Sequence, residues 1–419
     1  MRLIRAFCRF VFGLTFILSG FLKALDPVGF SLKINEYLIA FKLTFLDIFT
    51  EPLAIFLPVV EFVIGVSVLK GLKVNVFSRV ALCFIGFFTL LTFFVALFDP
   101  INDCGCFGEA IPLSNWETFI KNIILSIAAV IVFYGKDNVK KIASSTTQWI
   151  YIGLYTLIIV IIALYSYISV PFIDFGVYRL GTDLVETQNI QQNREYQTTF
   201  IYEKDGVQEN FTLDNLPDSS WVYVDTKTVQ VYGEEEDPSI DFAIRDSNGD
   251  YVSDELLSKQ NPVFIISYYE DKVISESDST DIATYAESLV SDGSDVYVLT
   301  LDPEYNVSKI LPQNTLYADF KTIISFNRSN GGLTYLDNGV VVHKWADWNF
   351  PNNMTEILET DHEVLTIVSE MKDRILFGGI LIFVYFLIII VRALSLIVYK
   401  IKQQGRLGAA SGVNCKKRE

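Results

Sequence analysis

The chain has 419 residues, of which 51% are hydrophobic, and a formal net charge of −16. Its mean hydropathy of +0.35 is too high for a soluble protein of this length, so the composition indicates a membrane protein that carries a large polar domain. The acidic balance argues against nucleic acid as a partner, because nucleic acid attracts basic surfaces.

Six hydrophobic runs are long enough to cross about 30 Å of hydrocarbon as helices. They span residues 7–25, 52–70, 76–98, 119–134, 150–170 and 375–399. The first run follows Arg2, Arg5 and Arg9 as a signal peptide would, but no small-x-small cleavage pattern comes after it. We therefore expect it to be a retained membrane helix.

Basic residues are concentrated in every second connection between these runs, and such connections face the cytoplasm. Both chain termini are therefore expected to be cytoplasmic. The connection after the third run and the acidic segment 172–373, here called the polar domain, are expected on the opposite, oxidising side. The polar domain contains no cysteine, which agrees with that placement.

The connection after the third run holds two cysteines separated by a glycine, in residues 103–109 with the sequence DCGCFGE, here called the CxC loop. A disulfide between Cys104 and Cys106 closes a tight ring, and Gly105 lacks the Cβ that would restrict its backbone. We expect such a pair to be strained and easily reduced, which favours a redox-active couple. A soft-metal thiolate site such as Cu(I) and a turn without chemistry stay open. Two thiolates are too few for a closed zinc site, so we assign no metal.

Three ionisable side chains lie in or near the predicted helices. Glu61 falls near the middle of the second run, where a carboxylate must pair, take up a proton or face a cavity. It could serve proton transfer or a quinone site, or form a structural hydrogen bond to another helix, for which Asn122 is the candidate partner. Lys23 and Asp26 are three residues apart, a helical ion-pair spacing, and we expect them to anchor the first helix at the membrane interface.

Several short motifs follow one another along the first third of the chain. They are SGFLK at 19–23, DPVGF at 26–30, Ile34 with Tyr37, Leu57-Pro58 with Glu61 and Gly65, CGCFG at 104–108, and Trp116 with Lys121-Asn122. With these motifs, residues 1–135 resemble the DoxX/MauE group of redox-associated proteins, which are four-helix bundles of the bacterial inner membrane. The resemblance implies disulfide formation or thiol handling in the periplasm. Quinone-coupled enzymes that generate disulfides typically carry a second cysteine pair, which this chain lacks. Either Cys104 and Cys106 exchange directly with a partner, or the bundle is a docking module.

The polar domain reads as two parts. Residues from about 196 to 252 alternate apolar and polar side chains, which predicts strands. From about 262 we expect a buried strand at 263–269, a helix at 278–289, a strand at 296–301, a helical stretch near 316–321, and a hairpin of strands 332–336 and 340–345. That order is similar to the thioredoxin fold. The position of its CxxC reads Tyr269-Glu270-Asp271-Lys272 here, so we expect no dithiol chemistry in this domain.

The sequence thus predicts a membrane α-helical protein whose four-helix DoxX/MauE-like bundle is followed by two further transmembrane helices flanking an α+β periplasmic domain. The predicted parts are the bundle (1–135), a cytoplasmic loop with the fifth helix (136–171), a β-rich segment (172–257), a thioredoxin-like domain without redox cysteines (258–373), and the sixth helix with a basic tail (374–419). The leading function is thiol–disulfide exchange through Cys104 and Cys106 on a periplasmic client, with quinone as the candidate cofactor. The alternative is a non-enzymatic scaffold or assembly factor of the cell envelope, so enzyme activity stays open.

Overall fold

A computed structural model describes residues 2–371 except 102, 140–143, 193–194, 205–206, 213–214, 219, 233–241, 272–274, 352–353 and 370, together with a few isolated residues between 374 and 389. The sixth predicted span, 375–399, falls almost entirely outside the described residues. The basic tail with Cys415 lies outside them as well.

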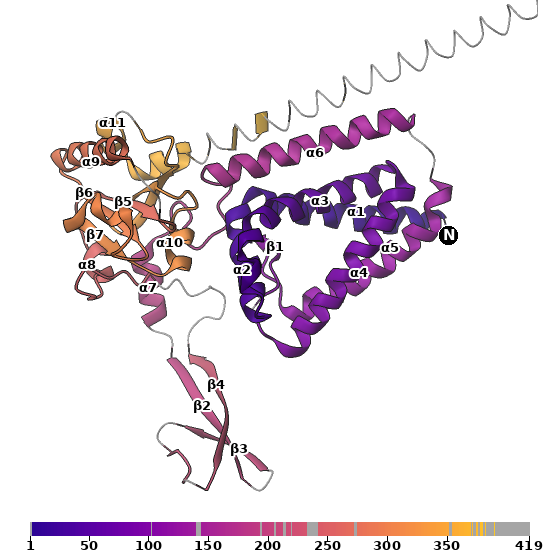
Figure 1. The fold of residues 1–419 in the computed structure, drawn as a ribbon, viewed down its shortest axis with the longest axis horizontal. Coiled ribbons are helices and arrows are strands. Elements are labelled where there is room, and N and C mark those ends of the chain that lie inside the picture. The colour runs from indigo at the N-terminus through magenta and orange to yellow at the C-terminus, as the bar shows by residue number, and fades with distance from the viewer. Residues whose placement is uncertain are drawn as a thin grey trace, which may run out of the picture.

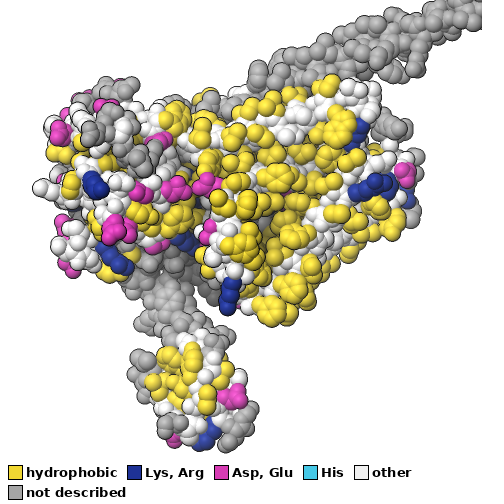
Figure 2. Space-filling model, viewed as in Figure 1, with side chains coloured by type: hydrophobic (Ala, Val, Ile, Leu, Met, Phe, Trp, Pro, Cys, Tyr) yellow, Lys and Arg dark blue, Asp and Glu magenta, His cyan; other side chains and the backbone are white. Residues whose placement is uncertain are grey.

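Within the described residues, five helices are long and apolar enough to cross a membrane. Hydrophobic side chains cover much of the surface of this part of the molecule, as expected for contact with lipid (Figure 2). The first five predicted spans all lie on these helices, so a multi-pass membrane segment is confirmed. The helices are α1 (Arg2–Leu25), α3 (Thr50–Lys70), α4 (Val74–Phe98), α5 (Asn115–Gly135) and α6 (Ser145–Ile168).

The connection from α1 to α3 contains two helical elements that are too short to be predicted as membrane spans. Helix α2 (Pro27–Ala40) begins directly after α1, and the 3₁₀ helix η1 (Thr44–Phe49) leads into α3. Asp26 caps α2, because its carboxylate accepts a hydrogen bond of 2.8 Å from the N–H of Gly29. Figure 1 shows α2, together with the short strand β1 (Cys106–Glu109), between the membrane helices and the polar domain.

Glycines let α1 and α3 approach each other closely. A Cβ atom at Gly20 would lie 2.6 Å from both the carbonyl oxygen of Pro58 and the backbone nitrogen of Phe62, and one at Gly65 would lie 2.7 Å from the backbone nitrogen of Ile17. Small residues at such crossings allow helix backbones to pack in van der Waals contact. This packing brings one face of α1 against one face of α3 along most of their length.

The polar domain begins with a small sheet that stands apart from the other elements in Figure 1. Its antiparallel strands lie in the order β3-β2-β4. They confirm the predicted strands up to residue 232, whereas the described residues from 242 to 252 contain only isolated bridges at Arg245. The elements are α7 (Leu184–Gln192), β2 (Glu195–Lys204), β3 (Val207–Thr212) and β4 (Val222–Tyr232).

The second part of the polar domain is a five-stranded mixed sheet in the order β7-β6-β5-β8-β9. The strands β5, β6 and β7 are parallel, while β8 is antiparallel to both β5 and β9. Every residue of β5 and β8 is buried, so these strands form the centre of the core. The elements are α8 (Ser253–Leu257), β5 (Val263–Tyr268), α9 (Glu276–Ser291), β6 (Asp295–Thr300), β7 (Thr315–Tyr317), α10 (Phe320–Phe326), β8 (Gly332–Asp337), β9 (Val340–Trp345) and α11 (Met354–Leu358), with 3₁₀ turns η2 (Lys136–Asn138), η4 (Asn306–Lys309) and η5 (Pro312–Asn314) elsewhere in the chain.

The predicted strand–helix–strand unit and hairpin are confirmed, and the hairpin turns through Asn338 and Gly339, which both have positive φ. The predicted helix near 316–321 was wrong in its position. Leu316 and Tyr317 pair with strand β6 instead, and α10 begins only at Phe320. Cross-strand pairing therefore overrides local helical pattern here. The likeness of this order to thioredoxin stays a prediction.

The packing of α1 on α3 gives a stability test. Gly20→Ala should lower the melting temperature in detergent, with a cost of about 1–3 kcal/mol, because the added methyl group meets backbone atoms that cannot move aside. Gly86→Ala on α4 is the matched control, since a Cβ there meets nothing within 4 Å. A Gly20 variant as stable as the Gly86 variant would contradict the close packing of α1 on α3.

Candidate redox site

The two cysteines of the CxC loop lie within hydrogen-bond distance of each other. Their Sγ atoms are 3.3 Å apart and both thiols are free. Cys104 is buried, whereas Cys106, the first residue of β1, is half-buried. Gly105 between them has a φ of +62°, and a Cβ there would lie 2.9 Å from Cγ of Lys33. Only glycine fits this position, because both the backbone conformation and the space exclude a side chain.

Side chains from α1 and α2 hold the CxC loop in place. The hydroxyl of Tyr37 donates to Sγ of Cys104 at 2.9 Å, and Ser19 donates to the carbonyl of Cys106 at 2.6 Å. Asp103 accepts a hydrogen bond of 3.0 Å from the N–H of Gly105. The loop therefore depends on both preceding helices for its shape, although α4 and α5 provide its ends.

The two thiols differ in acidity. The hydrogen bond from Cys104 lowers the pKa of Cys106 to about 6, against the opposing effect of burial, and the ammonium group of Lys121 contributes to the same lowering. The pKa of Cys104 is raised, first because its S–H is committed to Cys106 and then because it is buried. Cys106 is therefore the more acidic thiol of the pair, and Cys104 is its hydrogen-bond donor in this arrangement.

A buried ion pair on α1 and α3 lies next to this site. Lys23 and Glu61 are 2.6 Å apart, and their side chains are 9% and 11% exposed. Lys23 also donates to the hydroxyl of Ser19 at 3.1 Å, and Ser19 in turn binds the carbonyl of Cys106. The ion pair is thereby joined to the CxC loop through one hydroxyl group.

Two predicted pairings are wrong. Glu61 does not bond to Asn122, whose amide donates to the hydroxyl of Thr92 at 3.1 Å, because the close packing of α1 on α3 brings Lys23 within reach instead. Lys23 and Asp26 do not pair with each other either, since α1 ends between them and Lys23 turns towards α3. Both side chains are buried, which a simple interfacial anchor does not require.

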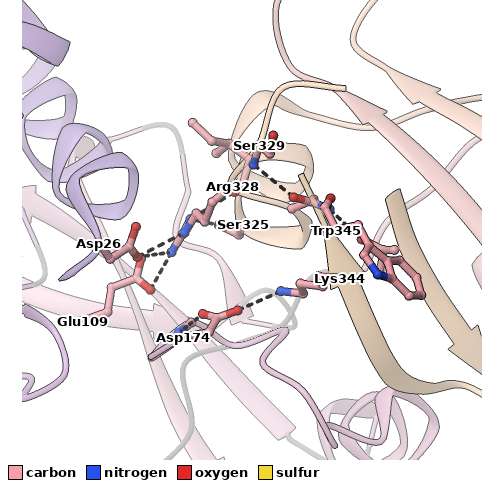
Figure 3. Close-up of polar contacts among 12 residues, drawn as sticks. Asp26, Glu109, Asp174, Ser325, Arg328, Ser329, Lys344 and Trp345 are labelled. Carbon is pink, nitrogen blue, oxygen red and sulfur yellow. Dashed lines mark hydrogen bonds and ion pairs between the residues drawn. The ribbon is translucent and has the colours of Figure 1, made fainter. Parts of the chain in front are cut away.

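Asp26 pairs with a residue that sequence reasoning missed. Arg328 of the polar domain, 302 positions away, donates to Asp26 at 3.1 Å and to Glu109 at 2.7 Å (Figure 3). Burial raises the pKa of Asp26 to about 6, against the attraction of Arg328, so Asp26 is mostly ionised at neutral pH. The side chain of Arg328 is 1% exposed. The sequence around Arg328 contains no pattern that would predict this contact.

Neither a metal nor a quinone can be assigned from the contacts. Among the described residues, no three His, Cys, Asp or Glu side chains lie together as metal ligands would. A cavity of about 450 Å³ lies on the face of α2 that carries Val28, Leu32 and Asn35, and extends to Glu51 and Glu270. Neither Glu61 nor the cysteines line it, so the cavity is separate from the redox site.

The acidity of Cys106 can be measured directly. In a variant without Cys8, Cys83 and Cys415, the alkylation rate of Cys106 should reach half its maximum near pH 6, since the thiolate is the species that reacts. Cys104→Ala should move this midpoint towards the ordinary cysteine value of about 8.5, because the hydrogen-bond donor is lost. Mass spectrometry of the alkylated peptide reports both rates. A parent midpoint at the ordinary value would contradict the lowered pKa of Cys106.

Two variants distinguish a structural role of Glu61 from a role in proton transfer. Glu61→Gln should destabilise the protein by about 3–5 kcal/mol, because it leaves the buried ammonium group of Lys23 without a counterion. Glu61→Leu combined with Lys23→Met removes both charges and should recover most of the melting temperature. We expect reoxidation of the CxC pair to recover with it. A double variant that is stable but slow in reoxidation would instead assign proton transfer to Glu61.

Parts of the chain are similar to known proteins. Residues 1–135 match the family of methylamine utilisation protein MauE, and residues 196–232 match a domain of unknown function (DUF8463). The chain is 23% identical over 184 residues to Protein TlpB of Flavobacterium psychrophilum, which covers 43% of this chain and 49% of TlpB. The chain thus spans about half the length of this curated relative, and no solved structure matches it. The first third of the chain, with its CxC loop, is a MauE-like membrane segment.

Proposed function

We propose that this membrane protein exchanges disulfides with a client protein through Cys104 and Cys106, in support of protein maturation in the periplasm. The observation that carries the proposal is the pair of unequal sulfurs 3.3 Å apart, with Cys106 half-buried and acidic and Cys104 buried behind it. A nucleophilic thiolate next to a protonated resolving thiol is the arrangement that exchange requires.

Cys106 and Cys104 can carry out the whole exchange, with all electrons and protons accounted for. The Cys106 thiolate attacks one sulfur of a client disulfide, which forms a mixed disulfide and releases the other client sulfur as a thiolate. Cys104 then loses its proton to a released thiolate and attacks Sγ of Cys106, which frees the second client sulfur. The client gains two electrons and the CxC pair becomes a disulfide; the reverse sequence oxidises the client instead. The hydroxyl of Tyr37 is placed to stabilise the Cys104 thiolate as it forms.

Repeated turnover also requires an electron donor or acceptor for the CxC pair. If the pair oxidises its client, the resulting dithiol must pass two electrons to an acceptor, and a membrane quinone is the candidate by chemical class. The polar domain has no cysteine and cannot relay the electrons itself. Its proposed task is to recruit the client beside the CxC loop, using its thioredoxin-like half as a binding module.

The proposed location is the bacterial inner membrane, with both termini in the cytoplasm and the polar domain in the periplasm. The basic connections between helices support this orientation. The ion pair of Arg328 with Glu109 also supports it, because that contact requires the polar domain and the CxC loop to lie at the same end of the membrane helices.

The second candidate function is a non-enzymatic scaffold or assembly factor of the cell envelope. The observation in its favour is the lack of a second cysteine pair, together with contacts of a cysteine-free domain with Asp26 and with the end of α6. In that case the CxC pair carries no essential chemistry, and the polar domain binds a partner without exchange.

A trapping experiment decides between the two. In Cys104→Ser, Cys106 can attack a client but nothing resolves the product, so a higher-mass adduct that collapses with reductant should accumulate on non-reducing gels. Cys106→Ser is the matched control and should give no adduct, because the remaining thiol is buried and burial itself raises its pKa. Absence of any adduct under several oxidant conditions, with a double serine variant that behaves like the parent, would favour the scaffold.

A further inference from the structure

Helix α10 of the polar domain presents a cation at each of its ends to the neighbourhood of the CxC loop. Lys321 lies in the first turn of α10, and Arg328 follows the last turn. Ile324, between them, packs against Val28 and Leu32 of α2. The helix is therefore docked on α2 by apolar contact, with one charge on either side of that contact.

Arg328 binds the C-terminal end of the CxC loop, at Glu109. Its Nη2 donates to the carboxylate of Glu109, the last residue of β1, at 2.7 Å (Figure 3). Its Nη1 donates at 3.1 Å to the carbonyl of Ile324, so the guanidinium also caps the end of its own helix. A side chain bonded on both sides and 1% exposed has little freedom, which fixes the position of Glu109 against α10.

Lys321 is connected to the N-terminal end of the CxC loop, at Asp103, through a chain of ion pairs. Its ammonium lies 3.2 Å from Glu36, which lies 3.0 Å from Lys33, and Lys33 lies 2.8 Å from Asp103. Asp103 accepts from the N–H of Gly105, between the two cysteines. The chain thus connects the polar domain to the backbone of the cysteine turn.

We propose that α10 is a positioning element for the redox pair, in which Arg328 and Lys321 fix the two ends of the CxC loop so that docking of the polar domain sets the reactivity of Cys106. The proposal rests on the proposed function and extends it, because the polar domain then tunes the pair as well as recruiting a client. The physical reason is that a short loop held at both ends has few conformations, which keeps the two sulfurs at hydrogen-bond distance.

Two matched double variants test the proposal in the full-length protein. Arg328→Met with Glu109→Gln removes one cation and one anion from the loop contact, and Asp26, with its raised pKa, can take up a proton when its partner is lost. Lys344→Met with Asp174→Asn removes a neighbouring ion pair of 2.8 Å that is equally buried on the cation side. Asp174 attracts Arg328 through space, so this control tests whether loss of nearby charge alone is enough to shift the midpoint. Each double variant replaces one cation and one anion by neutral side chains.

The readout is the pH midpoint of Cys106 alkylation, together with the alkylation rate of the buried Cys104. In the Arg328 variant the midpoint should rise by about one pH unit or more, because the hydrogen bond from Cys104 loosens, and Cys104 should react faster. In the Lys344 variant the midpoint should stay within about 0.3 pH units of the parent, even where the melting temperature falls. An unchanged midpoint in the first variant, or an equal shift in both, overturns the proposal.

A third variant decides the matter if the Arg328 variant does not fold. Lys321→Met breaks the chain of ion pairs at its α10 end, where the side chain is 70% exposed and contributes little to folding, and it should also raise the midpoint. No rise in this folded variant would count against the role of α10. Alkylation needs no client, so these results stand even if Cys104→Ser traps nothing, and failure of the proposed function is thereby distinguished from failure of this inference.

Discussion

The hydrogen bond between the two sulfurs of the CxC loop is the interaction on which the rest of the site depends. It makes two chemically identical side chains unequal, with the more acidic thiol at Cys106 and the hydrogen-bond donor at Cys104. Hydrogen bonds to sulfur are weak unless distance and orientation are held, so the surrounding structure must supply the rigidity. Tyr37, Ser19 and Asp103 each fix a different part of the loop.

Buried charges provide much of that rigidity, and they come from several parts of the chain. Lys23 and Glu61 neutralise each other between two membrane helices, where either alone would be costly. Arg328 pairs with the buried carboxylate of Asp26 and the half-buried carboxylate of Glu109 near the redox loop. Removing single partners from such groups is destabilising, whereas removing matched pairs is often tolerated. For that reason the arrangement can be dissected by paired substitutions.

Hydropathy and motif order were sufficient to predict the membrane helices, the CxC loop and the strands of the polar domain. Each of these features is local: a long apolar run, two cysteines around a glycine, or an alternating pattern bounded by turns. Individual partners were less predictable. The spacing of Lys23 and Asp26 suggested a helical pair, but the end of α1 between them and the close approach of α3 at Gly20 gave each a different partner.

The contact between Arg328 and Asp26 could not be predicted, because it joins residues 302 positions apart and nothing in the sequence around one residue indicates the other. Helix α2 was missed for a related reason. Its apolar stretch is too short to span a membrane. Its role follows from tertiary contacts, because one face packs against α10 and the side chains of Lys33 and Tyr37 contact the CxC loop. The sequence thus indicated the CxC loop as the candidate site, and the tertiary structure was needed to identify the residues that hold the loop in place.

The central claim, that Cys104 and Cys106 cycle between dithiol and disulfide, is tested most directly by thiol trapping in living cells. Acid quenching followed by alkylation with a mass-shifting maleimide would count free thiols on a variant that retains only these two cysteines. We predict that both the unlabelled disulfide and the doubly labelled dithiol are present, and that their ratio shifts with added oxidant or reductant and returns afterwards. A pair found in a single state that does not respond to either treatment would contradict the claim.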